Sequence, residues 1–272
     1  MSDNRAIGVF DSGLGGLTVV RELISTLPNE DIVYFGDTGR VPYGTRSRET
    51  IRKYALEDET FLLKQNVKLI VAACGTVSSV ASDTASDIPV PFFEVVSHAA
   101  RDAVNTTKNG IIAVIGTSAT IKSGMHEKYI KELMPTATVI TQSCSLFVPL
   151  VEEGWYSEND IIVTETIRRY FEPIISSGAD TLILGCTHYP ILSSAIKSVL
   201  GDKVALINAG TATSFGVKEY LEKNDMLNKN TIGGNHSFYV SDKADSFRHQ
   251  ASILLGRDID EQKVKQVDLS NI

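Results

Sequence analysis

The chain has 272 residues, 43% of them hydrophobic, and is therefore long enough to bury a large core. Its formal net charge is −7 and it contains no run of basic residues, which argues against nucleic-acid binding. The sequence has neither the start of a signal peptide nor an apolar stretch as long as a membrane span. We therefore expect a cytoplasmic protein that binds no nucleic acid and no membrane, with its 3 cysteines as free thiols.

Runs of aliphatic residues bounded by glycine or acidic turns recur along the chain. They lie at residues 6–11, 31–37, 68–74, 110–116, 181–186 and 203–209. Nearly continuous Val, Ile and Leu is typical of strands that are buried on both faces of a parallel sheet. Between these runs, charged faces opposite apolar ones predict helices at residues 18–27, 47–65, 158–177 and 189–200. The alternation predicts an α/β fold with doubly wound parallel sheets.

Two pairs of segments look alike and indicate a weak internal duplication. The segments LIVAACGTVSS (69–79) and LILGCTHYP (182–190) each end a strand in a cysteine followed by a helix-like stretch. The segments GVFDSGLGG (8–16) and IAVIGTSATIKSG (112–124) each lead a strand into a Gly/Ser/Thr turn. We expect two pseudo-symmetric domains with an interdomain active site. The predicted division is 1–97 plus 208–272 for the first domain and 98–207 for the second.

In open α/β sheets, ligands bind outside the carboxyl ends of the strands. By that rule Asp11, Asp37, Cys74, Thr117 and Cys186 belong to one rim. The glycine-rich turn that follows Asp11 matches neither a dinucleotide fingerprint nor a phosphate loop. Its backbone N–H groups could hold a small carboxylate. Alternatively, the turn only caps the following helix.

Two cysteines stand in matched contexts at the ends of predicted strands. Cys186 is followed by His188, and a nearby imidazole or helix N-terminus lowers a thiol pKa from about 8.5. Such a thiol can both take and give a proton. Cys74 has no histidine beside it, but Asp11 at the neighbouring strand end could assist it. A buried, inert cysteine is the alternative for either residue alone, whereas a matched pair favours acid/base chemistry.

Six motifs in chain order resemble those of glutamate racemases, in the cofactor-independent aspartate/glutamate racemase superfamily. They are IGVFDSGLGGLTVVREL, YFGDTGRVPYGTRS, LIVAACGTVSS, AVIGTSATIKSG, FVPLVEEG and LILGCTHYPIL. The resemblance implies two α/β domains, the first completed by the carboxyl-terminal segment, and a reaction without cofactor or metal. It also implies glutamate as substrate, D-glutamate for peptidoglycan as product, and often a homodimer.

The resemblance also assigns roles to individual residues. Cys74 and Cys186 match the acid/base thiols on opposite faces of the glutamate α-carbon. Cys74 with Asp11 serves D-glutamate in such enzymes, and Cys186 with His188 serves the L-enantiomer. The positions expected to contact substrate are Asp11, Ser12, Tyr43, Gly44, Gly75, Thr76, Thr117, Thr120, Thr187 and His188. Glu152 matches an acid that orients the histidine, although an ordinary surface glutamate is the alternative.

The chain departs from the family pattern at Gly75, where an asparagine usually follows the first cysteine. A lost buried hydrogen bond would cost about 0.5–1.5 kcal/mol unless another group replaces it. Gly39 and Ala119 replace the commoner Ala and Gly. The departure at Gly75 leaves open a racemase for another small acid such as aspartate. A Cys-His hydrolase and a non-catalytic binding protein are further alternatives.

Overall fold

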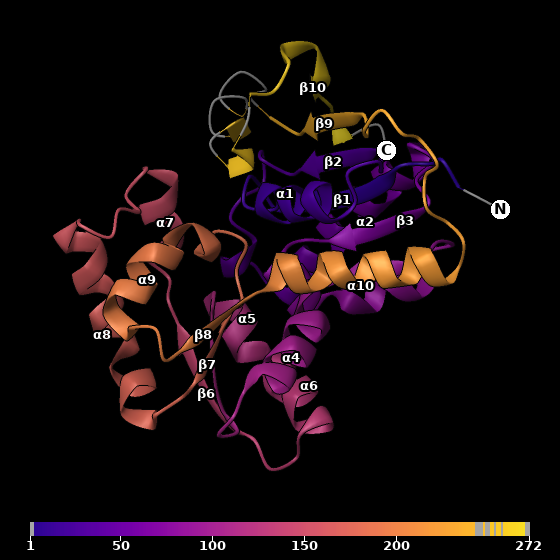
Figure 1. The fold of residues 1–272 in the computed structure, drawn as a ribbon. Coiled ribbons are helices and arrows are strands. Elements are labelled where there is room, and N and C mark those ends of the chain that lie inside the picture. Colours follow the sequence, from indigo (N-terminus) through magenta and orange to yellow (C-terminus); the bar gives the residue numbers. More distant parts are fainter. Residues whose placement is uncertain (1–2, 243–246, 248–250, 253, 257, 270–272) are drawn as a thin grey trace.

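The structure is a computed structural model that describes residues 3–242, 247, 251–252, 254–256 and 258–269. Within these residues the strands form a six-stranded sheet and a four-stranded sheet, and all their pairings are parallel. Figure 1 shows the larger sheet above the smaller one. The predicted α/β class with two sets of parallel strands is confirmed.

The two sheets repeat one strand order. The first has the order β10-β9-β2-β1-β3-β4 and the second the order β6-β5-β7-β8. The strand bounds are β1 (Ile7–Asp11), β2 (Ile32–Gly36), β3 (Leu69–Ala72), β4 (Phe92–Glu94), β5 (Ile111–Gly116), β6 (Thr138–Ser143), β7 (Thr181–Leu184), β8 (Ala205–Asn208), β9 (His236–Val240) and β10 (Val264–Gln266). The path β2-β1-β3-β4 therefore recurs as β6-β5-β7-β8, which matches the similarity expected of the two halves.

Helices connect the successive strands, because parallel neighbours need a crossover between them. The α-helices are α1 (Leu17–Thr26), α2 (Arg48–Lys64), α3 (Gly75–Val80), α4 (Val95–Thr106), α5 (Ser118–Ser123), α6 (Met125–Leu133), α7 (Phe147–Glu152), α8 (Ile161–Ser177), α9 (Ser193–Leu200) and α10 (Ala209–Lys223). The 3-10 helices are η1 (Tyr43–Thr45), η2 (Ser82–Asp87), η3 (Tyr189–Leu192) and η4 (Glu261–Lys263).

The hydrophobic core has a shared central part. Alternate residues of a strand face opposite sides, and on β1 Val9 joins one buried cluster while Phe10 joins another with α2 and α3. The cluster of Val9 continues through α1, α4 and α10 to Val114 of β5 in the second sheet. A third cluster packs the far face of the second sheet against α7, α8 and α9. One layer of helices therefore joins the two sheets.

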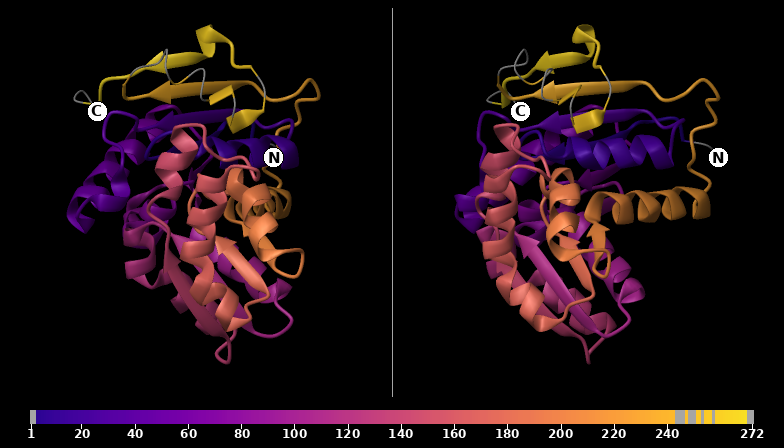
Figure 2. Two further views of the ribbon diagram at one scale, coloured as in Figure 1. Left: turned by 90° about the vertical axis from the view of Figure 1, so that its left-hand side faces the viewer. Right: turned by 60° about the vertical axis from the view of Figure 1, so that its left-hand side comes forward.

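The carboxyl-terminal segment returns to the first sheet, as expected. Strand β9 pairs with β2, and β10 pairs with β9. Figure 2 shows these two strands on the outer side of the first sheet from both directions. Helix α10 contacts α1 and α4 below that sheet. The division of the chain at residues 97 and 208 stays a prediction.

Three short strands, β4, β6 and β9, were not predicted, whereas the sequence at residues 260–269 indicates a surface strand or helix and contains β10. Strands β6 and β10 lie at sheet edges and are partly exposed, so they lack a continuous aliphatic run. Strands β4 and β9 are short or alternate in burial. The helix predicted at residues 189–200 is split into η3 and α9. In the part of the chain that the structure describes, no helix is long and apolar enough to cross a membrane.

A buried ion pair ties the returning chain to the first sheet. Lys68 Nζ lies 2.6 Å from Glu30 Oε2 and donates to the carbonyl oxygens of Asp3 and Met226, each at 2.8 Å. Glu30 Oε1 in turn accepts from the backbone N–H of Asn228 at 2.7 Å. The lysine is fully buried, so the ion pair with Glu30 and the two carbonyl oxygens replace the water around its charge.

We expect Lys68→Met to lower the free energy of unfolding by about 3–5 kcal/mol, because the Glu30 carboxylate would be left buried without its counter-charge. The measurement is chemical denaturation monitored by circular dichroism. Arg169→Met is the control, since the ion pair of Arg169 with Glu165 is largely exposed and contributes little. Equal effects of the two substitutions would contradict this account.

Candidate active site

A cavity of about 310 Å³ lies between the carboxyl ends of the two sheets. In the first sheet the next two strands of the chain, β2 and β3, lie on opposite sides of β1, and in the second sheet β6 and β7 lie on opposite sides of β5. Such points, where the strand order reverses, are where α/β folds bind ligands. The lining residues are Ser12, Val41, Pro42, Tyr43, Gly44, Thr45, Cys74, Gly75, Thr76, Thr117, Ser118, Ser145, Val148, Pro149, Glu152, Gly185, Cys186, Thr187, His188 and Tyr189. Most of the predicted site residues are therefore brought together.

Cys74 follows β3 and reaches the cavity from the first sheet. Its side chain is 4% exposed, and its Sγ lies 3.6 Å from Ser12 Oγ. Burial, with the nearby Asp11 carboxylate, raises the pKa of this thiol to about 12. Interactions of the sulfur with the Val77 N–H and with the Ser12 hydroxyl lower this pKa but are outweighed. Cys74 is therefore a thiol at neutral pH.

Asp11 ends β1 beside Cys74 and is 1% exposed. Its Oδ2 accepts from the Gly13 N–H at 3.0 Å. Burial raises the pKa of the carboxyl group, while the charge of His188 and the N–H groups of the turn oppose that change. The N–H groups of the turn therefore bind the carboxylate of Asp11 itself, and Ser12 rather than Asp11 lines the cavity.

Cys186 follows β7 and reaches the same cavity from the second sheet. His188 Nδ1 lies 3.9 Å from its Sγ. Burial by itself would lower the pKa of His188, but contacts with Cys186 and Glu152 and the charge of Asp11 raise it to about 10. The imidazole is therefore protonated at neutral pH and places positive charge beside the Cys186 sulfur.

Glu152, at the end of α7, lies on the other side of His188. Its Oε1 is 3.3 Å from His188 Nε2. The two atoms form an ion pair whose alignment is not that of a hydrogen bond. Glu152 lines the cavity although its side chain is 40% exposed, which places it at the rim.

Hydroxyl groups from both sheets meet on one side of the cavity. Thr76 Oγ1 lies 3.1 Å from Thr117 Oγ1, which lies 3.0 Å from Thr120 Oγ1. Thr117 also caps α5 by accepting from the Thr120 N–H at 3.3 Å. Thr120 is 1% exposed and is not among the lining residues, so it supports Thr117 from behind.

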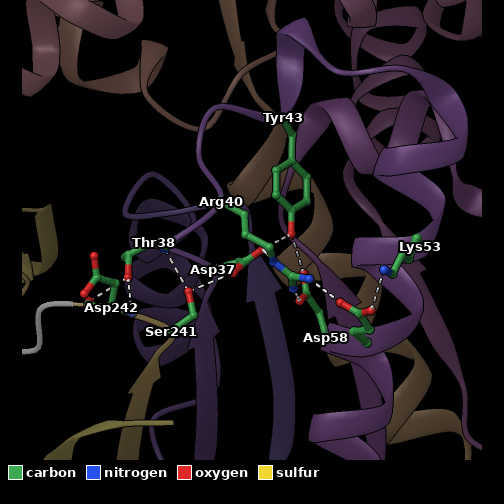
Figure 3. Close-up of polar contacts among 10 residues, drawn as sticks. Asp37, Thr38, Arg40, Tyr43, Lys53, Asp58, Ser241 and Asp242 are labelled. Carbon is green, nitrogen blue, oxygen red and sulfur yellow. Dashed lines mark hydrogen bonds and ion pairs between the residues drawn. The ribbon is translucent and has the colours of Figure 1, made fainter. Parts of the chain in front are cut away.

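Tyr43 and Gly44 form part of the cavity wall within η1. The ring of Tyr43 is buried, and its hydroxyl contacts Asp37 and Asp58, as Figure 3 shows. Gly44 packs so closely on the second sheet's turn that an added Cβ would lie 3.2 Å from Thr117 Cβ. Asp37, which we placed on the rim, contacts this wall and is not among the lining residues.

Two glycines allow the sheets to approach each other. A Cβ on Gly75 would lie closer than 3.0 Å to the Gly185 carbonyl oxygen. A Cβ on Gly15 would come equally close to the side chains of Thr187 and His188. Gly75 therefore does more than omit the side-chain amide of the asparagine that is usual in the family. It also lets the backbone beside Cys74 contact the backbone beside Cys186.

Sequence reasoning missed several residues of the site. Ser145 lies just past β6, and it was missed because that edge strand was not predicted. Pro42 and Pro149 stand within the recognised motifs next to residues that were chosen. Thr18 lies outside the cavity, and its Oγ1 donates to the Thr187 carbonyl at 2.9 Å across the sheets. The third cysteine, Cys144, is fully buried and is not among the lining residues.

The fold and the cavity together define a two-sheet α/β enzyme with paired thiols, and three comparisons agree. The family model for Asp/Glu/Hydantoin racemase matches residues 7–214. The chain is 43% identical over 253 residues to a glutamate racemase of Geobacter metallireducens, covering 93% of each protein. It is similar to the crystal structure of Francisella tularensis glutamate racemase in complex with D-glutamate, with a TM-score of 0.91, 38% identity and coverage of 99% and 100%.

A further crystal structure, of glutamate racemase from Thermus thermophilus in complex with beta-chloro-D-alanine, has a TM-score of 0.88 and 40% identity, with full coverage of both chains. The chain therefore belongs to the Asp/Glu/Hydantoin racemase family and is an isomerase. The resemblance that the six motifs indicated is confirmed.

We expect Gly75→Ala to reduce racemisation on the order of 10–100-fold, because its Cβ would push the two strand ends apart and displace the thiols. Gly75→Asn should also reduce activity, although asparagine is the usual residue in the family, because it adds a Cβ at the same place. Steady-state kinetics measured by circular dichroism would test both variants.

The matched control is Gly39→Ala, at the other position where glycine replaces a commoner residue. There a Cβ would lie 3.2 Å from Ser241 Oγ and 3.4 Å from Asp242 Cβ, with no contact below 3.0 Å. We expect this variant to keep nearly full activity. Full activity of Gly75→Asn would show that the sheets can separate without loss.

Proposed function

We propose that this protein interconverts L-glutamate and D-glutamate without a cofactor, using Cys74 and Cys186 as acid and base. The observation that carries the proposal is the position of the two thiols, which reach one cavity from the carboxyl ends of two different sheets. Racemisation needs a base on one face of the α-carbon and an acid on the other. The bound D-glutamate in the Francisella tularensis relative supports glutamate as substrate.

The surroundings of the thiols support a direction for each. For L-glutamate, Cys186 as thiolate takes the α-proton, and the Cys74 thiol gives a proton to the opposite face. Cys186 ends as a thiol and Cys74 as a thiolate, so D-glutamate is formed with no net consumption of protons. The protonated His188, 3.9 Å from Cys186, and the raised pKa of Cys74 favour this starting state.

The carbanion formed between these two steps must be stabilised. Hydroxyl groups of Ser12, Thr76 and Thr117, with the backbone around Thr187, line the cavity and are available to the α-carboxylate. Such oriented donors act strongly where water is excluded. We assign Asp11 and His188 as helpers of the adjacent thiols, and Glu152 as the residue that positions His188.

The alternatives are separated by one experiment. Each enantiomer of glutamate and aspartate is incubated with the protein in deuterated water, and optical rotation and α-deuterium are measured. A glutamate racemase inverts and labels only glutamate, whereas an aspartate racemase labels aspartate. A Cys-His hydrolase would use Cys186 and leave the position of Cys74 unexplained. Absence of label in every substrate would overturn the proposal.

The cellular role follows from the same assignment. D-glutamate would supply peptidoglycan synthesis in the cytoplasm, and we expect the protein to be a homodimer, as the resemblance implies. These statements stay predictions. Sedimentation of the purified protein would test the dimer.

We expect Cys74→Ala and Cys186→Ala each to abolish racemisation, since either change removes the acid or base from one face. Cys144→Ala is the matched control because that thiol is buried away from the cavity. Turnover of both enantiomers by each purified variant is the measurement. Full activity in either cavity variant would exclude the two-thiol mechanism.

We expect the rate of the L-to-D reaction to fall in alkaline solution as His188 loses its proton. The pKa of His188 is raised to about 10, so its positive charge persists up to that region and is lost above it. Glu152→Gln removes one cause of the raised pKa, and the alkaline limb of kcat/KM should therefore move to lower pH. The control is Glu153→Gln, its exposed neighbour. An unmoved limb in Glu152→Gln would contradict the role of Glu152.

A further inference from the structure

The hydroxyl group of Tyr43 lies between two buried carboxylates. Its oxygen contacts Asp37 Oδ2 and lies 3.0 Å from Asp58 Oδ2, as Figure 3 shows. Both aspartates are completely buried. A phenol has a single hydrogen and can donate to only one of them. If both carboxylates were ionised, the carboxylate oxygen that receives no hydrogen from Tyr43 would face the lone pairs of the tyrosine oxygen. One of the two carboxyl groups must therefore carry a hydrogen and donate it to Tyr43.

The contacts decide which carboxyl group carries that hydrogen. Asp37 is surrounded by donors, because Arg40 Nε donates to its Oδ2 at 2.5 Å and Ser241 Oγ donates to its Oδ1 at 2.8 Å. Asp58 receives one other donor, Arg40 Nη2, at 3.0 Å from its Oδ1. Among the residues drawn in Figure 3, Asp58 Oδ2 contacts the Tyr43 hydroxyl and receives no donor from Arg40. It is the atom that can bear a hydrogen without displacing a donor.

The charges of the cluster also favour a hydrogen on Asp58. Arg40 faces three carboxylates, those of Asp37, Glu57 and Asp58, and Lys53 lies 3.9 Å from Glu57. Full ionisation of the cluster would therefore leave one negative charge in excess, at the two buried aspartates that share Arg40. Burial raises the pKa of Asp58 well above its usual range. The charge of Asp37 adds to this effect, whereas Arg40 and Tyr43 oppose it.

Two further titratable groups face Asp58 within the fold. Glu59 on the same helix adds to the rise in the pKa of Asp58. The buried Tyr34 of β2 also senses the charge of Asp58. Neither group supplies positive charge that would favour ionised Asp58.

We propose that Asp58 is a positioning residue that stays protonated at neutral pH and donates its hydrogen to Tyr43, thereby holding the wall of the active-site cavity. Tyr43 then donates to Asp37, so one line of hydrogen bonds runs from α2 to Ser241 after β9. The wall residues Tyr43 and Gly44 line the cavity directly. The effect on turnover rests on the proposed function, whereas the position of the hydrogen does not.

Asparagine is the isosteric equivalent of a protonated aspartate, and it gives a sharp test. In Asp58→Asn the amide nitrogen can donate to Tyr43 while the amide oxygen still accepts from Arg40. In Asp37→Asn the same substitution removes the charge beside Arg40. We therefore expect Asp58→Asn to preserve the cluster and Asp37→Asn to disrupt it, although both variants replace a buried aspartate by asparagine.

The first readout is thermal unfolding as a function of pH. A carboxyl group whose pKa is raised in the folded state loses its proton on unfolding, so the wild-type protein loses stability as pH rises above about 4. Asp58→Asn carries no such proton. At neutral pH its Tm should exceed that of the wild type by about 2–4 °C. This difference in Tm should grow from acid to neutral pH. Asp37→Asn should have a lower Tm.

The second readout is the infrared C=O band of a neutral carboxylic acid at neutral pH. The difference spectrum of wild type minus Asp58→Asn should contain this band, and that of wild type minus Asp37→Asn should not. This measurement needs no substrate. If glutamate is not the substrate, the infrared and Tm results are unaffected.

The third readout is turnover of glutamate. Asp58→Asn should keep kcat/KM within about twofold of the wild type, and Asp58→Ala, which lacks the donor, should raise KM severalfold. The proposal is overturned if Asp58→Asn destabilises the protein as much as Asp37→Asn, or if its difference spectrum lacks the acid band. Those results would mean that Asp58 is an ionised partner of Arg40.

Discussion

The close approach of two parallel sheets at their carboxyl ends is the constraint on which the rest of this structure depends. Gly75 and Gly185 touch through backbone atoms, and Gly15 packs against Thr187 and His188. Behind these contacts a shared layer of helices joins the apolar faces of both sheets into one core. Because protein interiors are close-packed, a side chain inserted at this seam cannot be absorbed locally. The spacing of the two thiols is therefore a property of the whole fold.

The repeated strand order gives two similar frames, and the electrostatic surroundings make them different. Cys74 lies buried beside a carboxylate that raises its pKa, whereas Cys186 lies beside a protonated histidine. The duplicated topology therefore places the two cysteines at equivalent positions, and Asp11 and His188 give them different neighbours.

Polar groups outside the cavity hold its wall. A tyrosine on the wall turns its hydroxyl away from the cavity into a buried cluster, where Arg40 and two aspartates meet. Ser241, which follows β9, also contacts this cluster, so a strand from the end of the chain supports a wall built near its beginning. A buried network of this kind contributes to a single conformation only when every donor and acceptor has a partner. The location of its hydrogens therefore bears directly on the geometry of the site.

The sequence by itself determined the parallel α/β class, the six aliphatic strands and the two matched cysteines, because continuous aliphatic runs and strand-ending motifs are local patterns. It also indicated the family through motifs that include Cys74 and Cys186. Only the tertiary structure decided which residues share the cavity. Edge strand β6 has no aliphatic run, so Ser145 was missed, and Thr120 lies behind the wall. Gly75 has no space for a side chain because it contacts Gly185, which lies 110 positions further along the chain. Burial, close approach and pKa depend on such distant neighbours, which local pattern does not contain.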